Sequence, residues 1–215
     1  MASVALGLRN DVYRRPLATA LERLGISPGW KCVDVGAGGG DVSVALAQIV
    51  GEHGRVYAVD SDPSARDATA LAASAHHAQV LALTQSGEDL ILPEKVDLAF
   101  SRFLLLHVVD PAIVLARMAT TLKDSGWLVV QEPITSAGRI AGKPFSLPGA
   151  RHPDIGALLP GLVDGIGMKI VDSWAESPAG IGPGPISEYL EELTGVSSEN
   201  DSVVLPPLVT VIARH

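Results

Sequence analysis

The chain has 215 residues, of which 47% are hydrophobic and 19% are charged. This length and composition indicate one folded domain and exclude a disordered or collagen-like chain. The 24 acidic residues outnumber the 16 basic ones, and the formal net charge of −8 argues against a nucleic-acid partner. The single cysteine, Cys32, excludes an intrachain disulfide and a cysteine-based zinc cluster, and it suits a reducing compartment.

Hydrophobic periodicity predicts alternating helices and strands along the chain. The first half is expected to contain helices over 11–24, 42–50 and 64–75 and strands over 31–35, 55–60 and 80–84. The second half is expected to add strands over 96–101, 127–131, 168–173 and 207–213, with helices over 111–122 and 154–163 and one ending near Thr194. Such alternation predicts an α/β fold with a doubly wound, mainly parallel sheet that helices cover on both faces.

The N-terminal segment does not resemble a signal peptide. It has an apolar run over 2–8, but no basic region precedes this run and charged residues follow at once. No stretch reaches the roughly 18 consecutive apolar residues that a membrane span needs. We therefore expect a cytoplasmic protein with no membrane span.

A glycine-rich loop, Gly36-Ala37-Gly38-Gly39-Gly40, lies between the first predicted strand and the next helix. Glycines let the backbone approach a ligand closely, and the helix N-terminus offers unpaired N–H groups. Asp60 ends the next strand, 24 residues after Gly36. A carboxylate there is placed to accept hydrogen bonds from both ribose hydroxyls of an adenosine ligand. The loop could also be a strand–helix turn that needs glycine only for packing, and Asp60 could merely cap the next helix.

The acids around the loop distinguish between adenosine ligands. A dinucleotide-binding loop has glycine at the sixth position of its motif, where this chain has Asp41, a residue that would repel a pyrophosphate. Asp34 adds a second negative group beside the loop. A ligand that carries an ammonium and a sulfonium suits this setting better, and S-adenosylmethionine has both.

The segment 30–133 resembles class I S-adenosylmethionine-dependent methyltransferases, and within them the subgroup of quinone-biosynthesis methyltransferases. The resemblance implies a Rossmann-like, seven-stranded sheet with the last strand antiparallel beside the fifth. It assigns the methionine end of the cofactor to the first motif, with Asp34, Gly36, Ala37 and Gly38, the ribose to Asp60, and the adenine to Ser61, Ser86, Gly87 and Glu88. Ser101 and Arg102, in the motif after the fourth strand, are further cofactor-binding candidates, and Arg102 is expected to border the methionine end. The sequence departs from the family at Ser86, where many relatives have aspartate, and at the turn 122–127 before the fifth strand, which relatives usually build as Lys-Pro-Gly-Gly.

The resemblance also divides the single domain of residues 1–215 into parts. We expect an N-terminal helical cover over 1–27, a cofactor-binding core over 28–133, an acceptor-side insertion over 134–167 and C-terminal strands over 168–215. The acceptor-side region is short, so its pocket is either open or completed by another subunit, which makes a homodimer one expectation.

Methyl transfer from a sulfonium is an in-line displacement, so positioning supplies most of the catalysis and a base is optional. His107 follows the fourth strand and is the candidate base; its other interpretation is a histidine packed on Leu104–Leu106. Glu132 ends the fifth strand, where it either binds the acceptor or caps a loop. Tyr13, on the helix that covers the cofactor in relatives, and Phe103 are the candidate substrate contacts. His76-His77 has no third ligand nearby, so no metal site is expected.

Elimination narrows the substrate class. Enzymes that methylate the exocyclic amines of nucleic-acid bases usually carry an Asn/Asp-Pro-Pro-aromatic run after the fourth strand, where this chain has Ser101-Arg102-Phe103-Leu104. Enzymes that methylate carbon 5 of pyrimidines need a cysteine nucleophile, and Cys32 lies in the wrong place for that role. A small-molecule acceptor remains, with a hydroxyl slightly favoured over an amine or an activated carbon. Two alternatives stay open: a protein of this fold that binds S-adenosylmethionine without methyl transfer, to regulate or to catalyse a rearrangement, and a nicotinamide-dependent oxidoreductase, which Asp41 disfavours.

Overall fold

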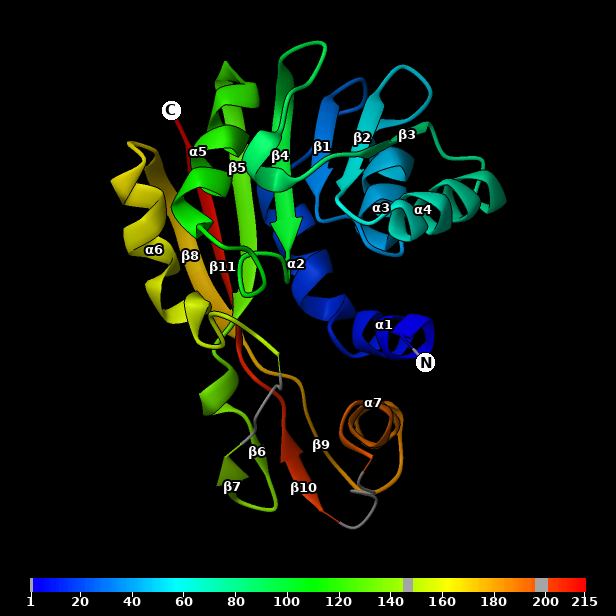
Figure 1. The fold of residues 1–215 in the computed structure, drawn as a ribbon, viewed down its shortest axis with the longest axis vertical. Coiled ribbons are helices and arrows are strands. Elements are labelled where there is room, and N and C mark those ends of the chain that lie inside the picture. Colours follow the sequence, from blue (N-terminus) through cyan, green and yellow to red (C-terminus); the bar gives the residue numbers. More distant parts are fainter. Residues whose placement is uncertain (1, 145–148, 196–200) are drawn as a thin grey trace.

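Figure 1 shows the fold in a computed structural model that describes residues 2–144, 149–195 and 201–215. The main sheet has seven strands. In spatial order they are β3 (Val80–Thr84), β2 (Arg55–Asp60), β1 (Lys31–Val35), β4 (Val96–Arg102), β5 (Leu122–Pro133), β11 (Leu208–Arg214) and β8 (Lys169–Glu176). The first five strands are parallel, and β11 is antiparallel to both β5 and β8. The predicted α/β class and the antiparallel last strand are confirmed.

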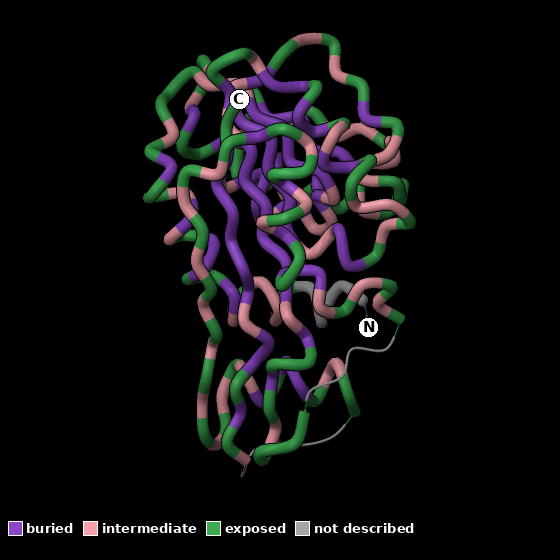
Figure 2. Tube along the Cα trace, turned by 90° about the vertical axis from the view of Figure 1, so that its left-hand side faces the viewer, coloured by how far each residue is buried: buried purple, intermediate pink, exposed green. Residues whose placement is uncertain are grey.

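Helices cover both faces of this sheet. The helices are α1 (Ala2–Val12), α2 (Arg14–Leu24), α3 (Asp41–Val50), α4 (Pro63–Ala75), α5 (Pro111–Thr121), α6 (Ile155–Gly165) and α7 (Pro185–Thr194), with short turns η1 (Gly87–Asp89) and η2 (Thr135–Ala137). Apolar residues of α2 and α3 pack on one face, around Leu98 and Phe100, and those of α5 and α6 pack on the other, around Ala99 and Val130. Figure 2 shows these buried residues concentrated along the strands of the main sheet.

The sequence patterns did not predict a second, smaller sheet. It contains β7 (Lys143–Pro144), β6 (Arg139–Ile140), β10 (Ser202–Val204) and β9 (Ala179–Ile181), in this spatial order. Together with α7 it forms a lower lobe beneath the main sheet (Figure 1). Tyr13, Tyr189, Leu190, Val203, Leu205 and Leu208 form the buried core that joins this lobe to the end of α1.

Two local expectations were wrong. The helix expected over 11–24 is two helices with a break at Tyr13, and α1 occupies the N-terminal apolar run. The expected turn before the fifth strand belongs to β5, which begins at Leu122. The pairing with β4 shifts from Leu122 opposite Val96 to Trp127 opposite Leu98, so the intervening residues bulge out of the pairing. No helix among the described residues is long and apolar enough to cross a bilayer.

Candidate functional site

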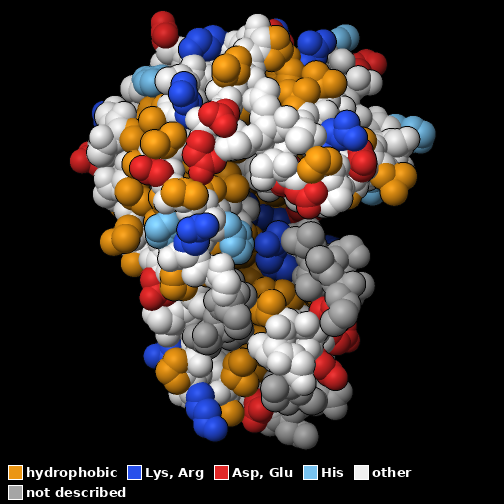
Figure 3. Space-filling view, in the orientation of Figure 1, with side chains coloured by type: hydrophobic (Ala, Val, Ile, Leu, Met, Phe, Trp, Pro, Cys, Tyr) orange, Lys and Arg blue, Asp and Glu red, His pale blue; other side chains and the backbone are white. Residues whose placement is uncertain are grey.

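The candidate site lies at the carboxyl edge of the parallel strands. The ends of β1, β2, β4 and β5 point toward α1 and the lower lobe (Figure 1). Between them the surface is hollowed, with basic side chains inside the hollow and histidines at its rim (Figure 3). This hollow, bounded by the loop Gly36–Gly40, the end of β4 and α1, is termed the site hollow below. Doubly wound sheets bind their ligands at this edge.

The glycine loop has the backbone that its residues were expected to allow. Gly36, Gly38 and Gly40 have φ values of +79°, +54° and +85°, in the left-handed region that favours glycine. A Cβ on Gly36 would lie 2.9 Å from Leu104 Cδ1, whereas a Cβ on Gly38 would meet only the Gly36 carbonyl oxygen, at 4.0 Å. The loop is therefore closely packed at Gly36 and open at Gly38, which leaves room for a ligand over Gly38.

Two neighbouring glycines of this loop are expected to differ in their tolerance of alanine. A Cβ on Gly40 would lie 2.9 Å from Thr69 Cα, a backbone atom of α4, and the φ at Gly40 is positive. We expect Gly40→Ala to lower the free energy of unfolding by about 2–3 kcal/mol. Gly39→Ala has open space and no positive φ, so it should change stability by less than about 0.5 kcal/mol. Urea denaturation of both variants tests this, and equal losses would contradict it.

Asp60 holds the loop against the end of β2. Its two carboxylate oxygens accept hydrogen bonds from the backbone N–H groups of Gly38, at 2.9 Å, and Asp62, at 3.0 Å. The carboxylate remains partly exposed and has further lone pairs for a ligand. Asp62, not Asp60, caps α4, because it accepts from the N–H of Ser64. The geometry therefore does not support the alternative in which Asp60 is only a helix cap.

Asp34 lies beneath the loop rather than in the site hollow. It is 2% exposed and accepts a hydrogen bond from the Ser43 hydroxyl at 2.6 Å. Burial raises the pKa of Asp34 to about 7, although the bond from Ser43 opposes this shift. Asp34 thus links β1 to α3 and fixes the start of the loop.

The predicted adenine residues lie on the loops after β2 and β3. Ser61 is exposed beside Asp60. Ser86 accepts a hydrogen bond from the Glu88 N–H, and its hydroxyl donates to the Glu88 carboxylate at 2.5 Å, which lowers the pKa of Glu88. A Cβ on Gly87 would lie 3.1 Å from Val114 on α5. The N–H of Gln85 donates to the Asp60 carbonyl at 2.9 Å, so this turn lies next to the expected ribose position.

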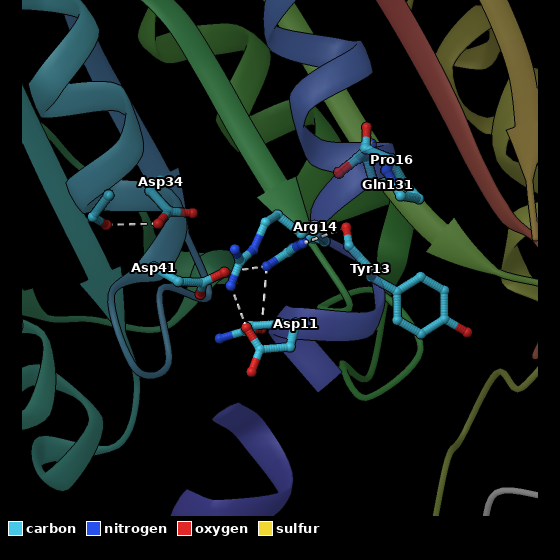
Figure 4. A network of polar contacts seen from close by, with 10 residues as sticks. Asp11, Tyr13, Arg14, Pro16, Asp34, Asp41 and Gln131 are labelled. Atoms are coloured by element: carbon cyan, nitrogen blue, oxygen red, sulfur yellow. Dashed lines mark hydrogen bonds and ion pairs between the residues drawn. The ribbon is translucent and has the colours of Figure 1, made fainter. Parts of the chain in front are cut away.

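At the end of β4, Arg102 forms a buried network that the sequence patterns did not predict. Its guanidinium makes an ion pair with Asp41 and donates to the Asn10 side chain at 3.2 Å and to the Tyr13 carbonyl at 3.5 Å. Figure 4 shows Asp41 and Tyr13 within this polar network. The Arg102 side chain is 3% exposed. Its neighbour Ser101 is fully buried, and the Ser101 hydroxyl has no hydrogen-bond partner among the described residues. Arg102 therefore neutralises the charge that Asp41 places beside the loop.

The two candidate substrate residues contact each other. The rings of Tyr13 and Phe103 meet edge to face, with centroids 5.1 Å apart. Tyr13 is buried, and its hydroxyl donates to the Pro206 carbonyl at 2.9 Å, so it anchors the chain rather than facing the hollow. Phe103 is partly exposed and has a φ of +55°, an uncommon value for a bulky residue. Only Phe103 of this pair is placed to touch a ligand.

Glu132 supports the loop after β4. It is fully buried, and its carboxylate accepts from the N–H groups of Leu104 at 2.8 Å, Leu105 at 2.7 Å and Leu106 at 3.4 Å. Burial raises the pKa of Glu132 to about 7, while the three backbone bonds act in the opposite direction. These contacts match the loop-capping interpretation and make Glu132 a positioning residue.

His107 follows the loop that Glu132 supports. The His107 side chain is exposed, and the backbone N–H of His107 donates to the Leu104 carbonyl at 2.9 Å. Partial burial and the nearby Arg9 both lower the pKa of His107. The imidazole is therefore mostly neutral at pH 7 and able to accept a proton.

Part of the chain is similar to known methyltransferase domains. Residues 33–130 match the model of the methyltransferase domain family. A "probable cobalt-precorrin-6B C(15)-methyltransferase (decarboxylating)" from Pyrobaculum aerophilum is 33% identical over 118 residues, which cover 55% of this chain and 60% of that protein. The chain thus matches less than two thirds of the length of this curated relative.

Solved structures share the fold along most of the chain. A S-adenosylmethionine-dependent methyltransferase from Aquifex aeolicus is 16% identical, with a TM-score of 0.66 over 92% of this chain and 88% of that chain. The [4+2]-cyclase SpnF is 18% identical, with a TM-score of 0.69 over 93% of this chain and 80% of that chain. At such low identity these likenesses show the fold alone. Residues 33–130 are thus similar to methyltransferase domains, and the chain has the fold of S-adenosylmethionine-dependent methyltransferases.

Proposed function

We propose that the chain transfers a methyl group from S-adenosylmethionine to a small-molecule acceptor bound in the site hollow. The observation that carries this proposal is the open glycine loop beside Asp60 within a segment that matches methyltransferase domains. The curated relative, which is named as a cobalt-precorrin methyltransferase, supports a small-molecule acceptor.

The residues at the hollow fit this cofactor. The space over Gly38 is open, Asp60 has spare lone pairs for ribose hydroxyls, and the buried Ser101 hydroxyl has no protein partner among the described residues. S-adenosylmethionine supplies an activated methyl group on a positively charged sulfur. The chain needs only to hold the acceptor in line with that methyl group, and the support of Glu132 for the loop 104–106 fixes the position of Phe103 and His107 for this purpose.

We propose a hydroxyl oxygen as the acceptor atom, with His107 as the base that takes its proton. The support is the lowered pKa of His107, which keeps the imidazole neutral at pH 7, and its exposure beside the hollow. Glu132 is not the base in this scheme, because its carboxylate is bound to three backbone N–H groups. The base adds about 10²- to 10⁴-fold at most, since positioning dominates this reaction.

Calorimetric titration of the purified protein with S-adenosylmethionine, S-adenosylhomocysteine and the nicotinamide cofactors is the first test. We expect the first two to bind and the nicotinamides to give no heat. An acceptor screen then measures release of S-adenosylhomocysteine. Nicotinamide binding alone would contradict the cofactor assignment, and cofactor binding with conversion of an acceptor but no S-adenosylhomocysteine would assign a rearrangement instead.

A further inference from the structure

Arg9 is a partly exposed cation with a buried Nε and no ion-pair partner among the described residues. It lies on α1, with its guanidinium carbon 4.6 Å from the centroid of the Phe103 ring. Its Nε is buried and has no hydrogen-bond partner, and no carboxylate of the described residues lies within ion-pair distance of it. A guanidinium with a buried, unpartnered N–H group costs free energy, so such a group normally has a hydrogen-bonding partner.

The charges around Arg9 do not neutralise it. Arg102, the neighbouring cation, already uses Asp41. Glu132 directs its oxygens to backbone N–H groups, and the pKa of Glu132 is raised to about 7. Tyr189, on α7, also faces Arg9 and is neutral at pH 7, because burial raises its pKa. The site hollow therefore carries unpaired positive charge in a chain whose net charge is −8.

Arg151 and His152 lie near the rim of the hollow. The backbone N–H groups of Arg151 and His152 both donate to the Leu106 carbonyl, which places this pair beside His107. The Nε2 of His152 is buried and has no partner among the described residues. Figure 3 shows basic and histidine side chains gathered at this rim. A positive centre suits an anion rather than a neutral group.

We propose that Arg9 binds a carboxylate in the site hollow and thereby selects a carboxylate-bearing methyl acceptor. This inference rests on the proposed function. Stacking of the guanidinium on Phe103 leaves its N–H edge for a planar, two-oxygen ligand. A carboxylate can come from two sources, the acceptor or the methionine end of the cofactor, and these are separable by titration.

The test compares wild type, Arg9→Gln and Arg14→Gln. Arg14 is the matched control, because it is an exposed arginine on the adjacent helix and pairs with Asp11. Each protein, saturated with S-adenosylhomocysteine, is titrated with benzoate and with benzamide, its neutral analogue. We expect benzoate to bind wild type and the control, benzamide to bind at least tenfold more weakly, and Arg9→Gln to weaken benzoate binding by about 10- to 100-fold.

A second arm identifies the source. Each protein is titrated with S-adenosylhomocysteine and with 5′-methylthioadenosine, which lacks the amino-acid carboxylate. If Arg9→Gln binds S-adenosylhomocysteine and 5′-methylthioadenosine as tightly as wild type does, the carboxylate that Arg9 binds belongs to the acceptor. A 10- to 100-fold loss for S-adenosylhomocysteine alone would overturn the proposal, because Arg9 would then bind the carboxylate of the cofactor and not that of the acceptor. Unchanged benzoate and S-adenosylhomocysteine binding in Arg9→Gln overturns the proposal.

Thermal unfolding separates this role from a structural one. Removal of an unpaired, partly buried charge should leave the Tm of Arg9→Gln equal to or above that of wild type, whereas a structural arginine would give a lower Tm and overturn the proposal. If wild type binds no S-adenosylhomocysteine, the proposed function fails. The benzoate titrations of wild type and Arg9→Gln, made without S-adenosylhomocysteine, then still test whether Arg9 binds a carboxylate.

Discussion

Asp60→Ala is expected to weaken the binding of S-adenosylhomocysteine by about a hundredfold or more, measured by calorimetric titration. The carboxylate stands at the end of β2 beside the open part of the glycine loop, where the ribose hydroxyls would donate to it. Two hydrogen bonds to a charged group contribute about 1.5–3 kcal/mol each. The variant should also lose about 1 kcal/mol of stability, because the Gly38 and Asp62 N–H groups lose their acceptor but remain accessible to water.

Asp62→Ala is the matched control for this prediction. Asp62 accepts from the Ser64 N–H and caps α4, so its loss should lower the free energy of unfolding by about 1 kcal/mol. Its exposed carboxylate has no role in the ribose site, so cofactor affinity should change less than twofold. Equal losses of cofactor affinity in Asp60→Ala and Asp62→Ala would mean that the glycine loop has only a structural role. Normal cofactor binding by Asp60→Ala would contradict the assignment of Asp60 to the ribose.

The main sheet was predictable because its elements carry strong periodic patterns. Strands β1 and β4 contain clusters of buried apolar residues, such as Leu98–Phe100 in β4. Asp110-Pro111 is a helix start, and the structure confirms its cap through bonds from the N–H groups of Ala112 and Ile113. The lower lobe was not predictable, since β6 and β7 are only two residues long. Such strands have no period, and they become strands only through long-range pairing.

At the candidate site, local motifs were predictable and distant partners were not. The positive φ values of the glycine loop follow from its residue types. The ion pair of Asp41 with Arg102 joins residues 61 positions apart, and it weakens the argument that Asp41 would repel a pyrophosphate. Arg9 belongs to a helix that the apolar run did not predict, so its approach to Phe103 had no sequence signal.

Glu132→Ala is expected to be among the most destabilising substitutions in the chain. It leaves three backbone N–H groups of the loop 104–106 without an acceptor, two of them in fully buried bonds. An unsatisfied buried donor costs about 1–3 kcal/mol, so the free energy of unfolding should fall by about 3 kcal/mol or more. Methyl transfer should fall with it, because the loop carries Phe103 and His107.

Glu132→Gln separates the hydrogen bonds of this residue from its charge. The amide oxygen can still accept from Leu104 and Leu105, but the side chain does not titrate. In wild type the pKa of Glu132 rises from 4.5 to about 7 on folding, so the folded state binds more protons between these pH values and stability falls as pH rises through them. At about 1.4 kcal/mol per pH unit, the wild type should lose about 3 kcal/mol across this window that Glu132→Gln does not lose.

Urea denaturation of both proteins at pH 4.5 and pH 8, followed by tryptophan fluorescence, measures this difference. Asp34, whose pKa is also raised to about 7, contributes the same slope to both proteins, so its effect cancels when the two are subtracted. The free energy of unfolding of Glu132→Gln should increase relative to that of wild type as pH rises from 4.5 to 8. A difference that is independent of pH would mean that Glu132 stays ionised in the folded protein, because the backbone N–H groups then fully offset its burial.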